Sequence, residues 1–169
     1  LWPSGDGTPR RLTVVGNRVY FYASDGHSGW ELWQTDGTPG GTVLVRDIDP
    51  TNTTVPSFFT ALGDTLFFTA HTPSFGRELW RSDGTPSGTV MVRNIHLTRS
   101  GYPEELTDVA GALFFYADDG LAGESGGFRI AFSPYIWLPS MSGWIGTRGV
   151  DTDVDATFLP KLQEVLPLF

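Results

Sequence analysis

Cysteine is absent from this chain of 169 residues, so the sequence excludes disulfide bonds and thiolate metal sites. A missing cysteine does not by itself separate a cytosolic protein from an exported bacterial one. No uninterrupted apolar run approaches the length of a membrane helix, and the start shows no basic-then-apolar signal region. Because the chain starts at Leu1 rather than Met, we expect an internal fragment of a longer protein.

Positive charge is also scarce. Only 11 Lys and Arg stand against 19 Asp and Glu, which gives a net charge of -8. Phosphate backbones require a basic surface, so this balance argues against nucleic acid as a partner. Hydrophobic residues nevertheless make up 40% of the chain, which is far from the composition of a disordered tail. We therefore expect one ordinary folded domain or a piece of a larger one.

Helix-favouring stretches of Ala, Leu, Glu and Lys are few, whereas glycine and proline are frequent. The 21 Gly and 12 Pro fall between short apolar runs, where they mark the ends of strands. The sequence therefore predicts a nearly all-β fold.

An internal repeat dominates the sequence. The segment ELWQTDGTPGGTVLVRDI (residues 31–48) returns as ELWRSDGTPSGTVMVRNI (78–95), with 13 of 18 positions identical and an offset of 47 residues. A third copy begins with LTDVAGALFFYADDG (106–120), which matches LTVVGNRVYFYASDG (12–26), and it stops where ELW is due. Copies are thus expected over 12–58 and 59–105, with a partial copy over 106–120.

Each copy predicts an antiparallel meander of four short strands. In the first copy these cover residues 12–15, 18–23, 30–34 and 42–48, with glycine-containing turns between them. The second strand (VYFYA, LFFTA or LFFYA) is apolar on both faces, so both faces must be covered. A four-stranded unit of this length with two apolar faces is typical of a β-propeller blade, which packs between two others.

The two long segments also resemble the ELWxxDGT repeat of long, exported bacterial proteins, some of them described as hyalin-like. This resemblance covers about residues 1–120. It implies tandem propeller-like blades in a secreted or surface-attached protein, with no catalytic residue assigned to the repeat. A closed propeller takes at least about four blades. Either the chain is a fragment, or a homo-oligomer completes the ring.

The pattern changes after residue 120. Residues 121–127 read as a glycine-rich linker, and 128–169 as a β-hairpin with strands over 128–138 and 150–156. The stretch FSPYIWLPSMSGWIGTRG (132–149) resembles the first hairpin of a group of Gram-negative outer-membrane barrel proteins. The resemblance implies contact with a membrane only if this segment belongs to a full barrel. A fusion of two unrelated pieces is the alternative.

The repeated DGT and Trp positions allow a structural and a functional interpretation. Asp36 and Asp83 begin DGT turns, in which Asp caps its own backbone, Gly takes a positive φ, and Thr starts or steers the next strand. Trp33 and Trp80 recur at one point of each copy, where they either pack between sheets or stack on sugar rings as a lectin platform.

Glu31 and Glu78 recur as well. They form either a carboxylate ladder for cations or partners of Arg46 and Arg93, and the recurring arginine favours the second interpretation. Together with the Trp and DGT Asp positions, they are the candidate binding residues.

Two further motifs suggest chemistry. Asp151, Asp153 and Asp155 occupy the first, third and fifth positions of an EF-hand-like loop, but Gly and Glu are missing later in it, so calcium is a weak candidate. GESGG (123–127) matches G-x-S-x-G, which makes Ser125 and His71 the least unfavourable candidates for a hydrolase. A flexible linker explains GESGG without catalysis.

The repeat therefore favours a non-catalytic binding scaffold of an exported or cell-surface bacterial protein. Such a scaffold would act in adhesion, with a glycan or a surface protein as its partner, and would require no cofactor. The alternatives are a hydrolase on a β-rich scaffold and an oligomeric propeller lectin.

Overall fold

In the computed structural model, the chain forms three antiparallel sheets, each with four strands in meander order. The structure describes residues 7–50 and 54–120, together with the backbone of 128–132 and 136–137. Sheet 1 contains β1 (Arg10–Val15), β2 (Arg18–Ser24), β3 (Trp30–Thr35) and β4 (Val43–Arg46). Sheet 2 contains β5 (Ser57–Leu62), β6 (Thr65–Thr72), β7 (Gly76–Ser82) and β8 (Val90–Arg93). Sheet 3 contains β9 (Glu104–Val109), β10 (Ala112–Tyr116), β11 (Phe128–Phe132) and β12 (Ile136–Trp137).

The expected all-β fold of four-stranded antiparallel sheets is confirmed. The strand bounds differ from the predicted ones by a few residues, most clearly in the fourth strand, which begins at Val43 and ends at Arg46. In the part of the chain that the structure describes, no helix could cross a membrane.

The third sheet takes its last two strands from outside the repeat pattern. The sequence assigns residues 128–138 to one strand of a separate segment. In the structure, β11 instead pairs with β10 from Tyr116↔Phe128 to Ala112↔Phe132, and β12 follows as a second short strand. β11 thus lies where the ELW strand lies in the other sheets. The second expected strand, 150–156, falls outside the described residues.

Backbone irregularities recur at the 47-residue offset of the sequence repeat. In each sheet the first strand has a shifted register, and a residue of positive φ lies within that shift. The equivalent positive-φ residues are Thr8, Val55 and Tyr102, then Arg11, Phe58 and Glu105, and finally Gly16, Gly63 and Ala110. The copies therefore share their bulges as well as their side chains.

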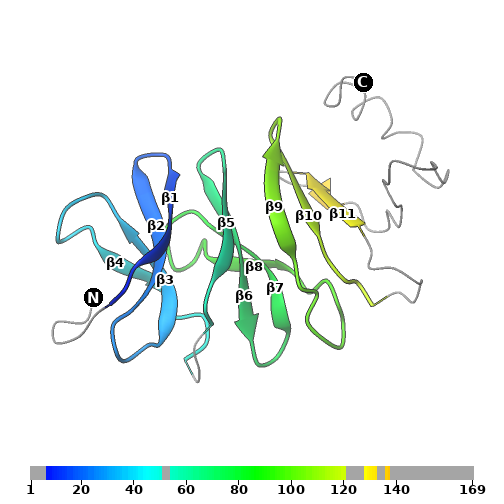
Figure 1. Cartoon of the computed structure of the whole chain (residues 1–169), viewed down its shortest axis with the longest axis horizontal. Coiled ribbons are helices and arrows are strands. Elements are labelled where there is room, and N and C mark those ends of the chain that lie inside the picture. Colours follow the sequence, from blue (N-terminus) through cyan, green and yellow to red (C-terminus); the bar gives the residue numbers. More distant parts are fainter. Residues whose placement is uncertain (1–6, 51–53, 121–127, 133–135, 138–169) are drawn as a thin grey trace.

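The three sheets lie side by side, with their first strands β1, β5 and β9 as neighbours (Figure 1). Two apolar cores result. The first, between sheets 1 and 2, contains Tyr20, Leu32, Phe68 and Trp80. The second, between sheets 2 and 3, contains Leu79, Leu113 and Phe115 among others. Both faces of sheet 2 are thereby covered, which explains why its second strand carries apolar side chains on both faces.

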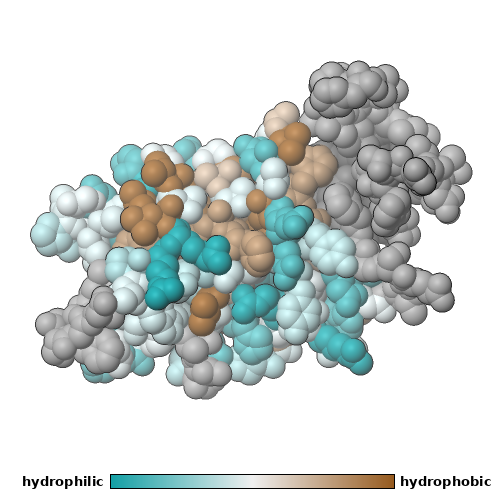
Figure 2. Space-filling model, in the orientation of Figure 1, coloured by the Kyte–Doolittle hydropathy of each residue, from teal (hydrophilic) through white to brown (hydrophobic). Residues whose placement is uncertain are grey.

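Some apolar side chains stay at the surface. Leu12, Val14 and Val43 of sheet 1 are all exposed. Figure 2 shows brown side chains gathered over this end of the molecule.

The turn between β9 and β10 carries an unfavourable residue. Ala110 has a φ of 51°, whereas its equivalents in the other two sheets are glycines. An L-residue in this left-handed region costs about 1 kcal/mol. Ala110→Gly is expected to raise the free energy of unfolding by about 0.5 to 1 kcal/mol, measured by urea denaturation. Gly63→Ala is the matched reverse change, and its new Cβ would have no atom within 4 Å. It is expected to lower the free energy of unfolding by a similar amount. Equal stabilities for wild type and Ala110→Gly would contradict this account.

Candidate functional site

The two DGT loops have the same hydrogen bonds. In the first, Asp36 Oδ1 accepts from the N–H and the hydroxyl of Thr38, at 2.9 and 2.7 Å. In the second, Asp83 Oδ1 accepts from the N–H and hydroxyl of Thr85 at the same distances. Hydrogen bonds from the threonine lower the pKa of each Asp, and the hydroxyl contributes more than the backbone amide. Each DGT segment is thus a closed Asx-type turn.

The glycine and threonine of the motif have defined roles. Gly37 and Gly84 take φ values of 91° and 90°, as the motif predicts. Of the two roles expected for the threonine, starting the next strand is wrong, because β4 begins at Val43. Thr38 Oγ1 instead accepts from Gly41 N at 2.9 Å, and Gly41 has no room for a Cβ because Asp36 Oδ1 would lie 1.9 Å from it. The motif therefore extends to D-G-T-x-x-G.

The second DGT loop docks on sheet 1. Gln34 Nε2 of β3 donates to the carbonyl of Gly84 at 3.0 Å, and Arg18 Nη1 donates to Gln34 Oε1 at 2.9 Å. Arg46 Nη1 donates to the carbonyl of Thr89 at 2.6 Å. We call Arg18, Gln34 and Arg46, together with Tyr20, the loop receptor. The loop is thus part of the packing between sheets 1 and 2.

The repeated tryptophans are buried. Trp33 is 6% exposed and Trp80 is 7% exposed. Trp80 lies in the core between sheets 1 and 2, where its ring centroid is 6.5 Å from that of Phe68. Buried rings have no open face for a sugar, so their position favours packing over a lectin platform.

The repeated glutamates are buried clamps for the chain that connects one sheet to the next. Glu31 Oε2 accepts from Ile48 N at 3.1 Å and from the Thr54 hydroxyl at 2.9 Å, in place of the expected Arg46. Glu78 uses both oxygens, accepting from Ile95 N and Gly101 N at 2.9 Å each. Both side chains are 0% exposed. Each carboxylate therefore ties the end of its repeat to its own third strand.

Burial changes the protonation of these clamps. It raises the pKa of Glu31 to about 8, and the nearby Asp47 charge adds to the shift, while the hydrogen bonds from Ile48 and Thr54 oppose it. Burial also raises the pKa of Glu78, against the hydrogen bonds from Ile95 and Gly101. Oε1 of Glu31 has no hydrogen-bond partner. A proton on that oxygen removes an otherwise uncompensated buried charge.

The catalytic and metal candidates are not assembled into a site. His71 lies on β6 opposite Arg77, is half-buried, and does not line the cleft described below. Ser125 and the calcium candidates Asp151, Asp153 and Asp155 lie outside the described residues. Within residues 7–50 and 54–120, no group of three or more His, Asp and Glu side chains could hold a metal ion.

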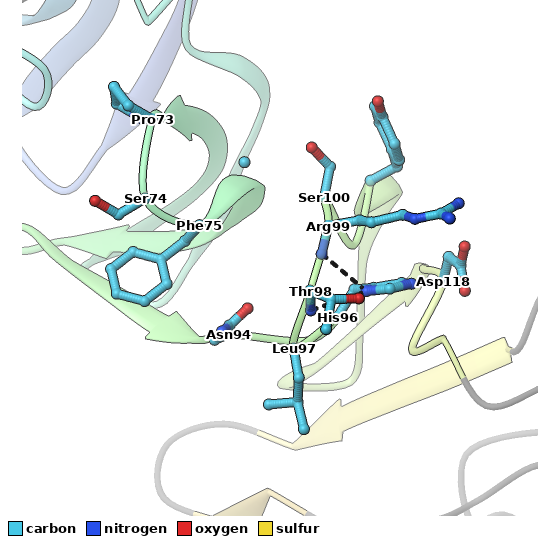
Figure 3. Close-up of a pocket in the computed structure, with 12 residues that line it drawn as sticks. Pro73, Ser74, Phe75, Asn94, His96, Leu97, Thr98, Arg99, Ser100 and Asp118 are labelled. Atoms are coloured by element: carbon cyan, nitrogen blue, oxygen red, sulfur yellow. Dashed lines mark hydrogen bonds between the residues drawn. The ribbon is translucent and has the colours of Figure 1, made fainter.

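A cleft of about 530 Å³ opens between the β6–β7 turn and the connection from β8 to β9 (Figure 3). Two exposed aromatic residues line it, Phe75 at 43% and Tyr102 at 54% exposure. The complete lining is Pro73, Ser74, Phe75, Gly76, Asn94, His96, Leu97, Thr98, Arg99, Ser100, Tyr102 and Asp118. The cleft thus combines apolar rings with groups that carry charge and hydrogen-bonding capacity.

The wall of the cleft formed by the β8–β9 connection is hydrogen-bonded to β7. The N–H groups of Gly101 and Tyr102 donate to the carbonyl of Arg77 at 3.1 and 3.2 Å, and Arg77 N donates to Ser100 Oγ at 2.9 Å. His96 Nδ1 accepts from Thr98 N at 3.3 Å and from Arg99 N at 3.1 Å. In the neutral imidazole the proton therefore sits on Nε2.

Sequence reasoning missed this cleft. Phe75 aligns with Ser28 at the repeat offset, and Tyr102 aligns with Val55. The sequence signal that could have indicated the cleft is therefore a difference between the copies: Phe75 and Tyr102 are aromatic where the preceding copy has no aromatic residue. In comparisons with family models, with curated proteins and with solved structures, no match to this chain was found.

The DGT loops offer a matched pair of substitutions. A Cβ on Gly84 would lie 2.6 Å from both Gln34 Oε1 and Tyr20 OH, whereas a Cβ on Gly37 would meet nothing within 4 Å. Gly37→Ala is expected to lower the free energy of unfolding by about 1 kcal/mol because of its positive φ. Gly84→Ala has the same backbone cost and adds the clash with sheet 1, so it is expected to lower the free energy of unfolding by about 2 to 4 kcal/mol. Urea denaturation of both variants checks this, and equal losses would contradict docking of the second loop.

The glutamate clamps predict a stability that falls as pH rises. The folded-state pKa of Glu31 is about 8, above its ordinary value of 4.5, so its stabilising contribution is complete below about pH 4.5 and is lost as pH rises through about 8. The loss is on the order of a few kcal/mol, since one pKa unit is about 1.4 kcal/mol. Glu31→Gln, which mimics the protonated form, is expected to flatten this slope and to be more stable than wild type at pH 8.

Glu78→Gln is the matched control. Both Glu78 oxygens accept backbone N–H groups, so an amide NH₂ would face a donor in either orientation. We expect a loss of about 1 to 3 kcal/mol at pH 6, measured by urea denaturation. An unchanged pH slope in Glu31→Gln would show that another group titrates.

Proposed function

We propose that this chain is a non-catalytic binding scaffold of an exported or cell-surface bacterial protein, and that it binds carbohydrate in adhesion. The sheets act as propeller-type blades, and the cleft between the β6–β7 turn and the β8–β9 connection is the ligand site. One observation carries this proposal: Phe75 and Tyr102, which break the repeat, are both exposed and line one cleft, whereas the recurring Trp33 and Trp80 are buried.

The composition of the cleft supports a sugar ligand. Exposed aromatic rings supply an apolar face for the C–H surface of a sugar ring. Because these side chains are rigid, they lose little conformational entropy when a ligand binds. Arg99, Asn94 and Asp118 supply donors and acceptors around those rings. The backbone bonds to Arg77 hold the wall in place before a ligand arrives, which limits the entropy lost on binding.

The sheet arrangement supports the blade interpretation. Sheet 2 packs on sheet 1 in the first core, and sheet 3 packs on sheet 2 in the second. The two contacts are equivalent, since Phe68 and Phe115, which occupy the same repeat position, face the preceding sheet in each. The resemblance of residues 31–48 and 78–95 to the ELWxxDGT repeat supports an exported location. Since the repeated Trp, Glu and Asp side chains serve packing and loop closure, the ligand site is expected among residues that differ between the copies.

A hydrolase on this scaffold is the alternative class. Its candidate nucleophile is Ser125, with His71 as its base. Hydrolysis of a bound glycan that disappears in Ser125→Ala would favour it, whereas any activity retained in that variant would remove it.

The cleft residues provide the binding test. The labelled chain is applied to an array of neutral and uronic-acid-containing bacterial oligosaccharides, and the strongest hit is titrated by calorimetry. Phe75→Ala and Tyr102→Ala are each expected to weaken binding about tenfold or more, the usual effect of removing a central aromatic contact. Tyr116→Ala is the control, because Tyr116 is 39% exposed and lies outside the cleft. An array without hits, or affinities that neither variant changes, would count against the proposal.

A further inference from the structure

The outward face of sheet 1 exposes apolar side chains that are covered in sheet 2. Leu12 and Val14 of β1 are 66% and 67% exposed. At the repeat offset they correspond to Phe59 and Ala61 of β5, which are partly buried against the core between sheets 1 and 2. Figure 2 shows the resulting brown area over β1. Sheet 1 thus presents the face by which sheet 2 binds its neighbour.

Other positions of this face agree. Trp33 and Leu44 correspond to Trp80 and Met91, and both of the latter pack in the core between sheets 1 and 2. In sheet 1 the equivalent cluster groups Trp33 and Leu44 with Phe21 and Ala23 of the same sheet. The two sheets therefore carry one docking face, which is used in sheet 2 and open along β1 in sheet 1.

The DGT loop beside this face is also open. Gly37 is exposed, whereas its equivalent Gly84 is buried against the loop receptor. Thr42 is half-buried, whereas its equivalent Thr89 is 0% exposed. Since both loops are closed by the same Asp and Thr hydrogen bonds, residues 36–42 already have the conformation that docks in the second loop.

We propose that this face docks a further four-stranded sheet of the same repeat. That sheet would carry Arg, Tyr and Gln at the positions equivalent to 18, 20 and 34, and its receptor would take up residues 36–42. Leu12 and Val14 would then be partly buried, as Phe59 and Ala61 are. The docked sheet would be a further blade of the proposed scaffold, and its docking does not depend on which ligand the cleft binds.

Among the described residues, no sheet of a second copy offers a free and complete receptor, since sheet 3 has Ala112 and Phe114 at the positions equivalent to Arg18 and Tyr20. The receptor of sheet 1 is filled by the chain's own second loop. Sheet 2 has Thr65, Phe67 and Arg81 at the positions equivalent to Arg18, Tyr20 and Gln34, so it lacks the tyrosine hydroxyl and the amide. The observations therefore favour a sheet with the complete receptor over self-association.

The test adds such a sheet to the full chain. A second copy of residues 7–53 is inserted before Gly7, so that the added copy continues into the chain at the natural repeat offset. Because the chain has no cysteine, Val14→Cys in the original copy reports on the face through its rate of maleimide labelling. The added sheet is expected to slow labelling about tenfold or more. Phe75→Cys, on the distant cleft, is expected to label at the same rate with and without the added sheet.

Receptor variants make the test specific. Tyr20→Ala with Gln34→Ala, both in the added copy only, is expected to restore fast labelling of Val14→Cys. Unchanged labelling in the extended chain would overturn the proposal, and so would an added copy that stays unfolded by circular dichroism. Protection that grows with concentration in the unextended chain would assign the face to a second copy and likewise overturn it.

Discussion

The second strand of each sheet is apolar on both faces, so a sheet leaves apolar side chains exposed to water unless a neighbour covers them. Sheet 2 shows how this requirement is met, because Phe68 and Trp80 face sheet 1 while Leu79 faces sheet 3. The hydrophobic effect supplies the attraction but does not specify orientation. The docked DGT loop does, since Gln34 and Arg46 bind particular carbonyls of that loop.

The residues that recur and those that differ perform separate tasks. Recurring Asp, Trp and Glu side chains close loops, fill cores and hold the connections between sheets. The Asp and Glu hydrogen bonds recur in the two full copies because they lie within each copy's own loop and connection. Phe75 and Tyr102 are exposed and differ from their equivalents Ser28 and Val55, so the proposed function places binding specificity there.

Much of the fold could be predicted from residue order, but little of the cleft. The all-β class and the strand positions follow from turn residues and apolar runs, which are local signals. The partner of Glu31 could not be predicted, because Arg46 and the backbone of Ile48 lie close in sequence and only the folded geometry separates them. The pairing of β11 with β10 in sheet 3 could not be predicted either, because FRIAF has no counterpart in the repeat.

By itself the sequence determined the class of fold, the length of the repeated unit and the conformation of the DGT turns. All three depend on interactions within a few tens of residues, so that identical segments give identical local structure. Only the tertiary structure decided that Trp33 and Trp80 are buried, that one DGT loop is docked while its twin is open, and that a cleft forms beside Phe75. Those outcomes depend on which surfaces meet, and equal sequences can have unequal neighbours.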